Sequence, residues 1–328
     1  MTALLDIRDL VVEFPLPGSA ARVLHHVGLR VETGQSVGIV GESGSGKSMT
    51  ALAAMGLLPD AAEASGSIRL DGEEILGLGD AAMSQIRGRR IGMIFQEPMT
   101  ALNPVRTIGD QVAEGLRLHL GLSGAEALDR AVAVLERVGL PRARFSPDLH
   151  PHQLSGGQRQ RVGIAIALAC GPELLIADEP TTALDVTIQA QILDLICEVT
   201  ADAGMALLMI SHDLGVVAET TDRMLVMYAG TVVEEGPTAE VFAHMAHPYT
   251  QGLFAAMPAR ELIGGLRGRL ATIPGQVPDP RAERVGCPFA PRCPRARERC
   301  RVETPPADRF GADHTVRCFY PGKEERAA

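Results

Sequence analysis

The sequence predicts an α/β fold with a mixed β-sheet core, an antiparallel β subdomain and a helical subdomain, followed by a small Cys-rich C-terminal module. Two observations predict the core. Residues 36–40 have the pattern of a short buried strand, residues 41–48 of a glycine-rich turn and residues 49–58 of a helix. Further apolar stretches end in polar or acidic side chains, as strands of α/β sheets do at a ligand site: residues 90–95, 174–177 and 206–210.

The turn at residues 41–48 matches the phosphate-loop pattern G-x-x-x-x-G-K-[ST] at every fixed position. Its glycines allow backbone N–H groups to form an anion nest, to which the following helix adds its positive end. A nucleoside triphosphate fits this nest, with Lys47 at the β- and γ-phosphates and the Ser48 hydroxyl on Mg²⁺. A chance glycine-rich turn is the alternative, and the strand–turn–helix context argues against it. The residues expected to bind nucleotide are Gly41, Glu42, Ser43, Gly44, Ser45, Gly46, Lys47 and Ser48.

The N-terminal stretches 5–14 and 23–31 alternate partly between apolar and polar residues, which predicts half-buried antiparallel strands. Together with residues 66–72 they predict a small β subdomain beside the nucleotide. Phe14 lies upstream of the phosphate loop, and two interpretations of its ring stay open. The ring either stacks on adenine or is an ordinary core aromatic.

Gln96 follows the apolar stretch 90–95, at the sheet edge where ligand-binding groups emerge, and is a candidate for sensing the nucleotide. The residues after it lose strand character. Helix-like segments at 107–120 and 124–138 predict a helical insertion of roughly fifty residues, which is longer than an ordinary loop. We expect this helical subdomain to span about residues 97–160.

A second candidate anion site follows the insertion. Ser155 is a good N-cap for a helix that continues through residues 159–168, and bare glycine amides lie beside the helix start. A simple capped helix is the alternative when this stretch is considered alone. Because the same chain carries a phosphate loop, we interpret the stretch as a second phosphate-binding element, made of Ser155, Gly156, Gly157 and Gln158.

Two adjacent carboxylates, Asp178 and Glu179, end the apolar stretch 174–177. A solvated strand end is the structural alternative, but a buried strand has no packing reason to end in two acids. Asp178 suits the acid that holds Mg²⁺, directly or through water, and Glu179 suits the group that orients or deprotonates the attacking water. Asp185 follows, and His212 comes after the next apolar stretch, where a catalytic role competes with that of an ordinary histidine.

Composition distinguishes two parts of the chain. The 328 residues are 46% hydrophobic and carry a net charge of −9, and no apolar run reaches the roughly 18 residues that span a membrane. A soluble protein is expected, without nucleic acid as its main partner. From residue 259 onward, however, the net charge is +5, and this stretch holds 9 of the 22 prolines and four of the six cysteines. The contrast predicts two domains, residues 1–257 and 258–328.

Taken together, these motifs resemble the nucleotide-binding domain of ATP-binding-cassette (ABC) proteins, over about residues 4–250. The resemblance implies a P-loop NTPase-type fold, with Glu179, His212 and Gln96 as catalytic residues. It implies Ser48, Gln96 and Asp178 as the Mg²⁺ ligands. The motif assignments are the Q-loop for Gln96, the signature for residues 154–158, the end of Walker B for Asp178 and Glu179, the D-loop for Asp185 and the switch histidine for His212.

The resemblance also implies a working cycle. Two such domains pair head to tail, and each ATP lies between the phosphate loop of one and the signature of the other. ATP binding closes the pair, and hydrolysis at Glu179, helped by His212, releases it. Gln96, at the root of the helical insertion, is expected to convert closure into movement of a partner.

A narrower resemblance is to the ATPase subunits of bacterial dipeptide and oligopeptide importers, with their nickel and glutathione relatives. Residues 95–104, 176–185, 247–250 and 287–293 carry it, and the last two stretches weigh most because general cassettes lack them. One departure is the generic signature Leu-Ser-Gly-Gly-Gln, from which some peptide-importer subunits diverge. The implied partners are a second ATPase subunit, identical or related, two membrane permease subunits and, indirectly, an external binding protein. The implied location is the cytoplasmic face of the bacterial inner membrane.

Four cysteines lie in the Pro- and Arg-rich C-terminal stretch, separated by 5, 6 and 17 residues: Cys287, Cys293, Cys300 and Cys318. Disulfides do not suit a reducing cytosol, and the spacings match neither a zinc knuckle nor a common ferredoxin run. Spacing alone therefore leaves an iron–sulfur cluster, zinc and plain thiols open. The importer resemblance implies a [4Fe–4S] cluster.

The predicted function is an ATP-binding and ATP-hydrolysing subunit that powers an ABC importer for peptides, with ATP as substrate and Mg²⁺ as cofactor. The alternative is a soluble ABC ATPase that acts on nucleic acid or ribosomes. Such proteins often have two cassettes in one chain or a long coiled-coil insertion, and this sequence has neither.

Overall fold

The computed structural model describes residues 3–96, 101–182, 184–257 and 272–322. Its main element is an eight-stranded sheet in the order β11-β12-β10-β9-β3-β8-β7-β6. The five strands from β9 to β6 are parallel, and the β9–β10 hairpin makes the sheet mixed, as predicted. The five parallel strands are β3 (Ser36–Val40), β6 (Ile91–Ile94), β7 (Leu174–Asp178), β8 (Ala206–Ser211) and β9 (Arg223–Tyr228), and the antiparallel strand of the hairpin is β10 (Thr231–Pro237).

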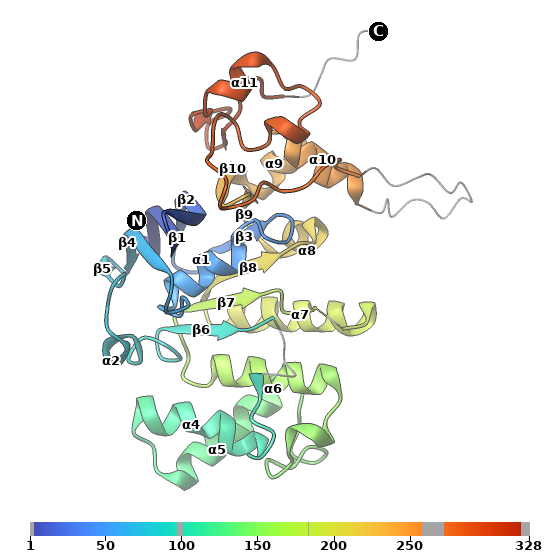
Figure 1. The fold of residues 1–328 in the computed structure, drawn as a ribbon. Coiled ribbons are helices and arrows are strands. Elements are labelled where there is room, and N and C mark those ends of the chain that lie inside the picture. The colour runs from blue at the N-terminus through green and yellow to red at the C-terminus, as the bar shows by residue number, and fades with distance from the viewer. Residues whose placement is uncertain (1–2, 97–100, 183, 258–271, 323–328) are drawn as a thin grey trace, which may run out of the picture.

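The parallel strands separate two hydrophobic cores, because successive side chains of a strand point to opposite faces. In β7, Leu175 and Ala177 join one core, whereas Leu174 and Ile176 join the other. The helices that pack beside these strands include α1 (Lys47–Ala54), α6 (Gly156–Leu168), α7 (Val186–Asp202) and α8 (Leu214–Thr220) (Figure 1). The two-sided burial explains why the sequence of each strand is a continuous apolar run.

A four-stranded antiparallel sheet, in the order β2-β1-β4-β5, covers the second core. It confirms the predicted β subdomain. Pro15 lies inside β1, which was not expected, but the pairing of β1 with β4 ends at Glu13, so only β2 pairs with the chain at Pro15. The strands are β1 (Leu5–Leu16), β2 (Ser19–Val31), β4 (Glu63–Leu70) and β5 (Glu73–Glu74), and the short helix α2 (Asp80–Met83) leads to β6.

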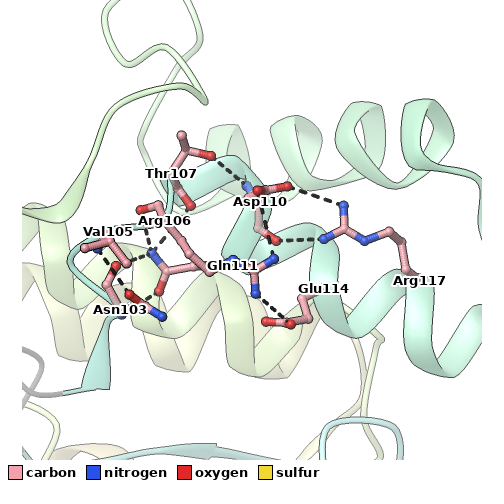
Figure 2. A network of polar contacts seen from close by, with 8 residues as sticks. All are labelled: Asn103, Val105, Arg106, Thr107, Asp110, Gln111, Glu114 and Arg117. Atoms are coloured by element: carbon pink, nitrogen blue, oxygen red, sulfur yellow. Dashed lines mark hydrogen bonds and ion pairs between the residues drawn. The ribbon is translucent and has the colours of Figure 1, made fainter.

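The predicted helical region consists of α4 (Ile108–Leu120) and α5 (Gly124–Arg137), which pack on α6 at one end of the molecule (Figure 1). The loop before α4 is fastened by the buried Gln111, whose Oε1 accepts from Asn103 N at 2.8 Å and whose Nε2 donates to the carbonyls of Asn103 and Arg106 (Figure 2). Thr107 caps the helix by accepting from Asp110 N. Only the start of this region, residues 97–100, lies outside the described residues.

The C-terminal part does not form the separate Cys-rich module expected from composition. Strand β12 (Thr315–Val316) pairs with β10 and carries β11 (Asp308–Arg309) into the main sheet, and Phe289 belongs to the first core. The expected boundary at residue 258 lies outside the described residues, so the division at residue 257 stays a prediction. The remaining helices are α9 (Thr238–His244), α10 (Pro248–Ala256) and α11 (Glu298–Val302).

The chain after β10 forms two helices, α9 and α10, and not one continuous helix. Met245 takes a left-handed conformation after α9, and His247 caps α10, whose first residue is Pro248. A proline at that position lacks only an N–H that a helix start would leave unpaired. Among the described helices, none combines the length and the apolar character needed to cross a membrane.

Candidate functional site

The phosphate loop connects β3 to α1, as predicted, and two of its glycines, Gly41 and Gly46, have no room for a larger side chain. Gly46 has φ 101°, a conformation that favours glycine, and a Cβ there would lie 2.6 Å from Leu24 Cδ2. A Cβ on Gly41 would lie 2.2 Å from the Met227 carbonyl oxygen. The glycines are therefore required by the close approach of β2 and β9 as well as by the turn itself.

Lys47 folds back over this loop. Its side chain is buried, and Nζ donates to the carbonyl oxygens of Gly41 at 2.8 Å and Glu42 at 3.1 Å. Burial lowers the pKa of the amine, while the nearby acids Glu179, Asp178 and Glu42 raise it. Ser45 Oγ is also buried and has no hydrogen-bond partner among the described residues. An unpaired buried hydroxyl and a buried cation in one loop suit an anionic ligand.

Ser48 and Asp178 lie side by side, although 130 positions separate them in the chain. The Ser48 hydroxyl donates to Asp178 Oδ1 at 3.0 Å. Burial raises the pKa of the Asp178 carboxyl, and the hydrogen bond from Ser48 partly offsets this. A hydroxyl oxygen and a buried carboxylate at the end of the phosphate loop are a donor set that fits Mg²⁺.

Glu179 is the centre of a second cluster. Its Oε2 accepts from Gln96 Nε2 at 3.1 Å and from Thr182 Oγ1 at 3.0 Å, and it lies 3.1 Å from His212 Nδ1. Its backbone φ is 46°, which is uncommon for a residue with a side chain and is typical of functional sites. The structure thus brings together Gln96, Glu179 and His212. Sequence reasoning missed Thr182, although it follows Glu179 by only three residues.

A cavity of about 290 Å³ joins the phosphate loop to the second cluster: its lining includes most of the loop, Gln96 and Glu179, but not Asp178, Thr182 or His212. It also includes residues that the sequence analysis did not single out: Arg22, Val23, Ala229, Pro278, Pro280 and Arg284. Phe14 is not among the lining residues and lies opposite Ala21 in the β1–β2 pair. Its role as an adenine platform stays a prediction.

The glycine-rich stretch at the start of α6 lies outside this cavity. Ser155 caps the helix by accepting from Gln158 N, and the Gln158 side chain accepts from Ser155 N at 2.8 Å. Ser155 and Gly156 are exposed, and a Cβ on Gly157 would meet Ile188. Asp185 caps α7 by accepting from Ile188 N at 3.0 Å. The signature candidate and Asp185 therefore lie close together, away from the phosphate loop of their own chain.

The C-terminal part contacts Glu42 of the phosphate loop through Arg292 and Tyr249, and we call these contacts the clasp. Arg292 forms a two-pronged ion pair with Glu42, at 2.7 and 3.0 Å, and is itself buried. Glu42 N donates to Tyr249 Oη at 2.8 Å, and the ring of Tyr249 packs on Tyr228 and Phe289. No local sequence signal links residues 250 positions apart, so sequence reasoning did not find this contact.

The four C-terminal cysteines line one small cavity, of about 20 Å³. Burial raises the pKa of Cys287 to about 11 and also raises the pKa of Cys293 and Cys318. Thiol chemistry would suit a soft metal, but the space holds about one water and not an eight-atom cluster. Within the described ranges, no group of three or more His, Cys, Asp or Glu side chains is placed to hold a metal ion. The structure as it stands does not support the expected [4Fe–4S] cluster.

A phosphate loop with an acid pair beside it defines a nucleotide-hydrolysing class of protein, and comparison with known proteins gives the family. Residues 24–182 match the model described as ABC transporter, and residues 233–300 match the C-terminal region of oligopeptide/dipeptide transporters. A putative peptide import ATP-binding protein of Brucella melitensis is 49% identical, over 96% of each chain. The oligopeptide transport ATP-binding protein OppD of Salmonella typhimurium is 46% identical, over 98% of this chain and 95% of that one. The chain belongs to the ABC transporter family, in its group of peptide import ATP-binding proteins.

Two further likenesses concern length and fold. OppD of Mycobacterium tuberculosis is 48% identical over 97% of this chain, but the chain spans only about half of that protein, 52%. The structure of a dimeric ATP-binding cassette in a post-hydrolysis state, bound to ADP and Pi, has a TM-score of 0.63 and is 30% identical, over 71% of this chain and 98% of that one. The predicted ABC ATPase fold is thereby confirmed.

Proposed function

We propose that this chain is the ATP-hydrolysing subunit that powers an ABC importer for di- or oligopeptides across the cytoplasmic membrane. One observation carries the proposal. A site with phosphate loop, acid pair, glutamine and histidine together occurs in a chain whose C-terminal part matches the oligopeptide/dipeptide transporter region. Full-length relatives named as peptide import ATP-binding proteins support it, and nothing favours the rival class that acts on nucleic acid or ribosomes.

Each residue of the site has a role in this reaction. Lys47 and the amides of the phosphate loop bind the β- and γ-phosphates. Ser48, Asp178 and Gln96 are the groups that would hold Mg²⁺, which neutralises charge on the phosphates. Glu179 accepts the proton of the attacking water or orients it, held in place by Gln96 and Thr182. His212, whose Nδ1 lies 3.1 Å from Glu179 Oε2, assists Glu179.

The working unit in this proposal is a head-to-tail pair of cassettes, identical or related. The support is the separation of the two anion-binding elements. Ser155, Gly156 and Gly157 do not line the cavity of their own chain, and they lie with Asp185 on one exposed surface. A second subunit would offer its phosphate loop to this surface, which completes two sites at once.

The helical region is the proposed contact with two permease subunits. Val105 and Leu118 are 79% and 75% exposed there, so two large apolar side chains face solvent, and neither of them lines the cavity. The polar network in Figure 2 holds the loop of Val105 rigidly on α4. In this proposal the protein is a peripheral subunit at the cytoplasmic face of the inner membrane, and an external binding protein delivers the substrate to the permease subunits.

For the four cysteines we keep the [4Fe–4S] cluster as a proposal on one ground, the convergence of four thiols on one cavity. The sulfur atoms would have to move apart to accommodate it. Iron and acid-labile sulfide in anaerobically purified protein, lost in a Cys293→Ser variant, would support the cluster. Zinc alone, or no metal, would contradict it.

The importer itself is tested by purifying the chain with its permease subunits and measuring ATPase activity in proteoliposomes. The expected result is hydrolysis that rises when peptide and binding protein are added. A Glu179→Gln complex provides the control for contaminating ATPases. Hydrolysis that ignores peptide but rises with nucleic acid or ribosomes would overturn the proposal.

A further inference from the structure

We propose that Arg284 is a nucleotide-binding residue, supplied by the C-terminal segment, that contacts the phosphate and ribose nearest the base of the bound nucleotide. The proposal rests on the proposed ATP site. It adds to that site a set of lining residues from the C-terminal part, which lie outside the phosphate-loop, signature and Walker B motifs. The lining of that cavity includes Pro278, Pro280 and Arg284 beside the phosphate loop. The chain just before these residues also holds Arg292 in position for its ion pair with Glu42, because Arg292 donates to the carbonyls of Ile273 and Pro274.

The order of the strands tells which end of the nucleotide Arg284 faces. The phosphate loop follows β3, and β8, β7 and β6 lie on one side of β3, while β9 and β10 lie on the other. Glu179 follows β7, so the reacting phosphate lies on that side. Arg284 Nη1 donates to Thr231 Oγ1 at 3.1 Å and Nη2 to the Ala229 carbonyl, both at the β9–β10 turn. Arg284 therefore faces the opposite end of the nucleotide.

The surroundings of Arg284 lack a counter-charge. Both of its hydrogen-bond acceptors are neutral, and among the described residues no carboxylate forms an ion pair with it. Arg22, the other arginine that lines the cavity, pairs with Glu13 at 3.1 Å. Burial lowers the pKa of Arg284 to about 10, and its charge contributes to lowering the pKa of His25 to about 4. A half-buried guanidinium of this kind suits a phosphate, which is the anion that the loop beside it binds.

The segment is also fixed in place. Pro280 accepts from Arg22 N at 3.1 Å, and the prolines restrict the backbone before Arg284. A contact to a fixed arginine costs less side-chain entropy than one to a free arginine. The adenine end of the site is thereby lined by the C-terminal part of the same chain.

The test is the dissociation constant of Mg-ATP and Mg-ADP for wild type, Arg284→Gln and Arg281→Gln. Arg281 is the matched control, because it lies three residues away, is exposed and pairs with Asp279. We expect Arg284→Gln to weaken ATP and ADP equally, by about tenfold, and Arg281→Gln to leave both unchanged. Because Arg281 does not line the cavity, Arg281→Gln should also leave the turnover number at saturating ATP near that of wild type.

Two further measurements separate a nucleotide contact from a structural one. Thr231→Val removes one acceptor of Arg284 and should change nucleotide affinity less than Arg284→Gln does. In wild type, ATP should protect Arg284 but not Arg281 from modification by phenylglyoxal, which needs no mutant to fold. Equal affinity of wild type and Arg284→Gln, a loss confined to ATP, or equal modification with and without ATP would each overturn the proposal. Failure of the wild type to bind ATP would instead contradict the proposed function.

Discussion

The phosphate loop and the signature are both glycine-rich turns that start a helix, but their surroundings differ. The phosphate loop is enclosed by its own chain. Lys47 bonds back to the loop, Ser48 donates to Asp178, and Arg292 and Tyr249 hold Glu42 from the C-terminal part. Among the described residues, the side chains of Ser155 and Gln158 in the signature bond to each other's backbone N–H at the start of α6, and Ser155 remains exposed. This difference is what the proposed head-to-tail pair requires, because in that pair the phosphate loop is completed within the subunit and the signature by a second subunit.

The largest expected effect concerns the enclosed element. Glu179→Gln removes the carboxylate that we propose orients or deprotonates the attacking water, so turnover should fall by about 100-fold or more while ATP affinity stays near wild type. Steady-state hydrolysis and nucleotide binding measure the two quantities. Glu173→Gln is the control, since Glu173 precedes β7 and pairs with Arg90 away from the cavity. Full turnover in Glu179→Gln would remove the assigned role.

The next effect tests the clasp. Arg292→Gln leaves Glu42 without its partner beside a buried tyrosine pair, so the free energy of unfolding should fall by about 2 kcal/mol, and ATP affinity should fall with it. Urea unfolding and ATP titration measure both. Arg281→Gln, in the same C-terminal part, removes an exposed ion pair with Asp279 and should change neither. Equal losses in the two variants would mean that the clasp does not support the loop.

The pH dependence of stability tests the same enclosure from another side. His247 is buried, its Nδ1 accepts from Tyr249 N, and burial lowers its pKa to about 4, although Glu234 opposes this. The unfolded chain binds a proton below about pH 6.5 and the folded chain does not, so stability present above pH 6.5 is lost as pH falls toward 4. The loss attributable to His247 should be roughly 3 kcal/mol.

Urea unfolding at pH 7.5 and pH 5 measures this slope. His247→Gln keeps an acceptor for Tyr249 N but does not titrate, so the slope should decrease in that variant. A slope identical to that of wild type would assign the pH dependence to other groups.

The smallest effect concerns the exposed element. Ser155→Ala removes a helix cap and should lower the free energy of unfolding by about 1 kcal/mol, without changing ATP affinity of the isolated chain. Ser123→Ala is a closely matched control, because Ser123 caps α5 with the same reciprocal arrangement. Only Ser155→Ala should also lower the ATPase activity of the assembled transporter. A loss of ATP binding in the isolated Ser155→Ala chain would contradict the division between the two elements.

Local patterns predicted most of the fold and the acid pair because each motif is short and lies at the end of an apolar strand. The clasp of Arg292 on Glu42 and the position of Arg284 depend on contacts between distant segments, which no local pattern specifies. Composition misled us at the C-terminus. Proline, arginine and cysteine suggested a separate unit, whereas Phe289 packs into the first core and β12 extends the sheet.

The position of Arg292 has a consequence for biosynthesis. A ribosome makes the phosphate loop early, yet the residue that fixes Glu42 emerges 250 positions later. Contacts of such long sequence separation form late in folding. A nascent or truncated chain would therefore lack a finished nucleotide pocket, and ATP-dependent activity would begin only once synthesis of the C-terminal part is complete.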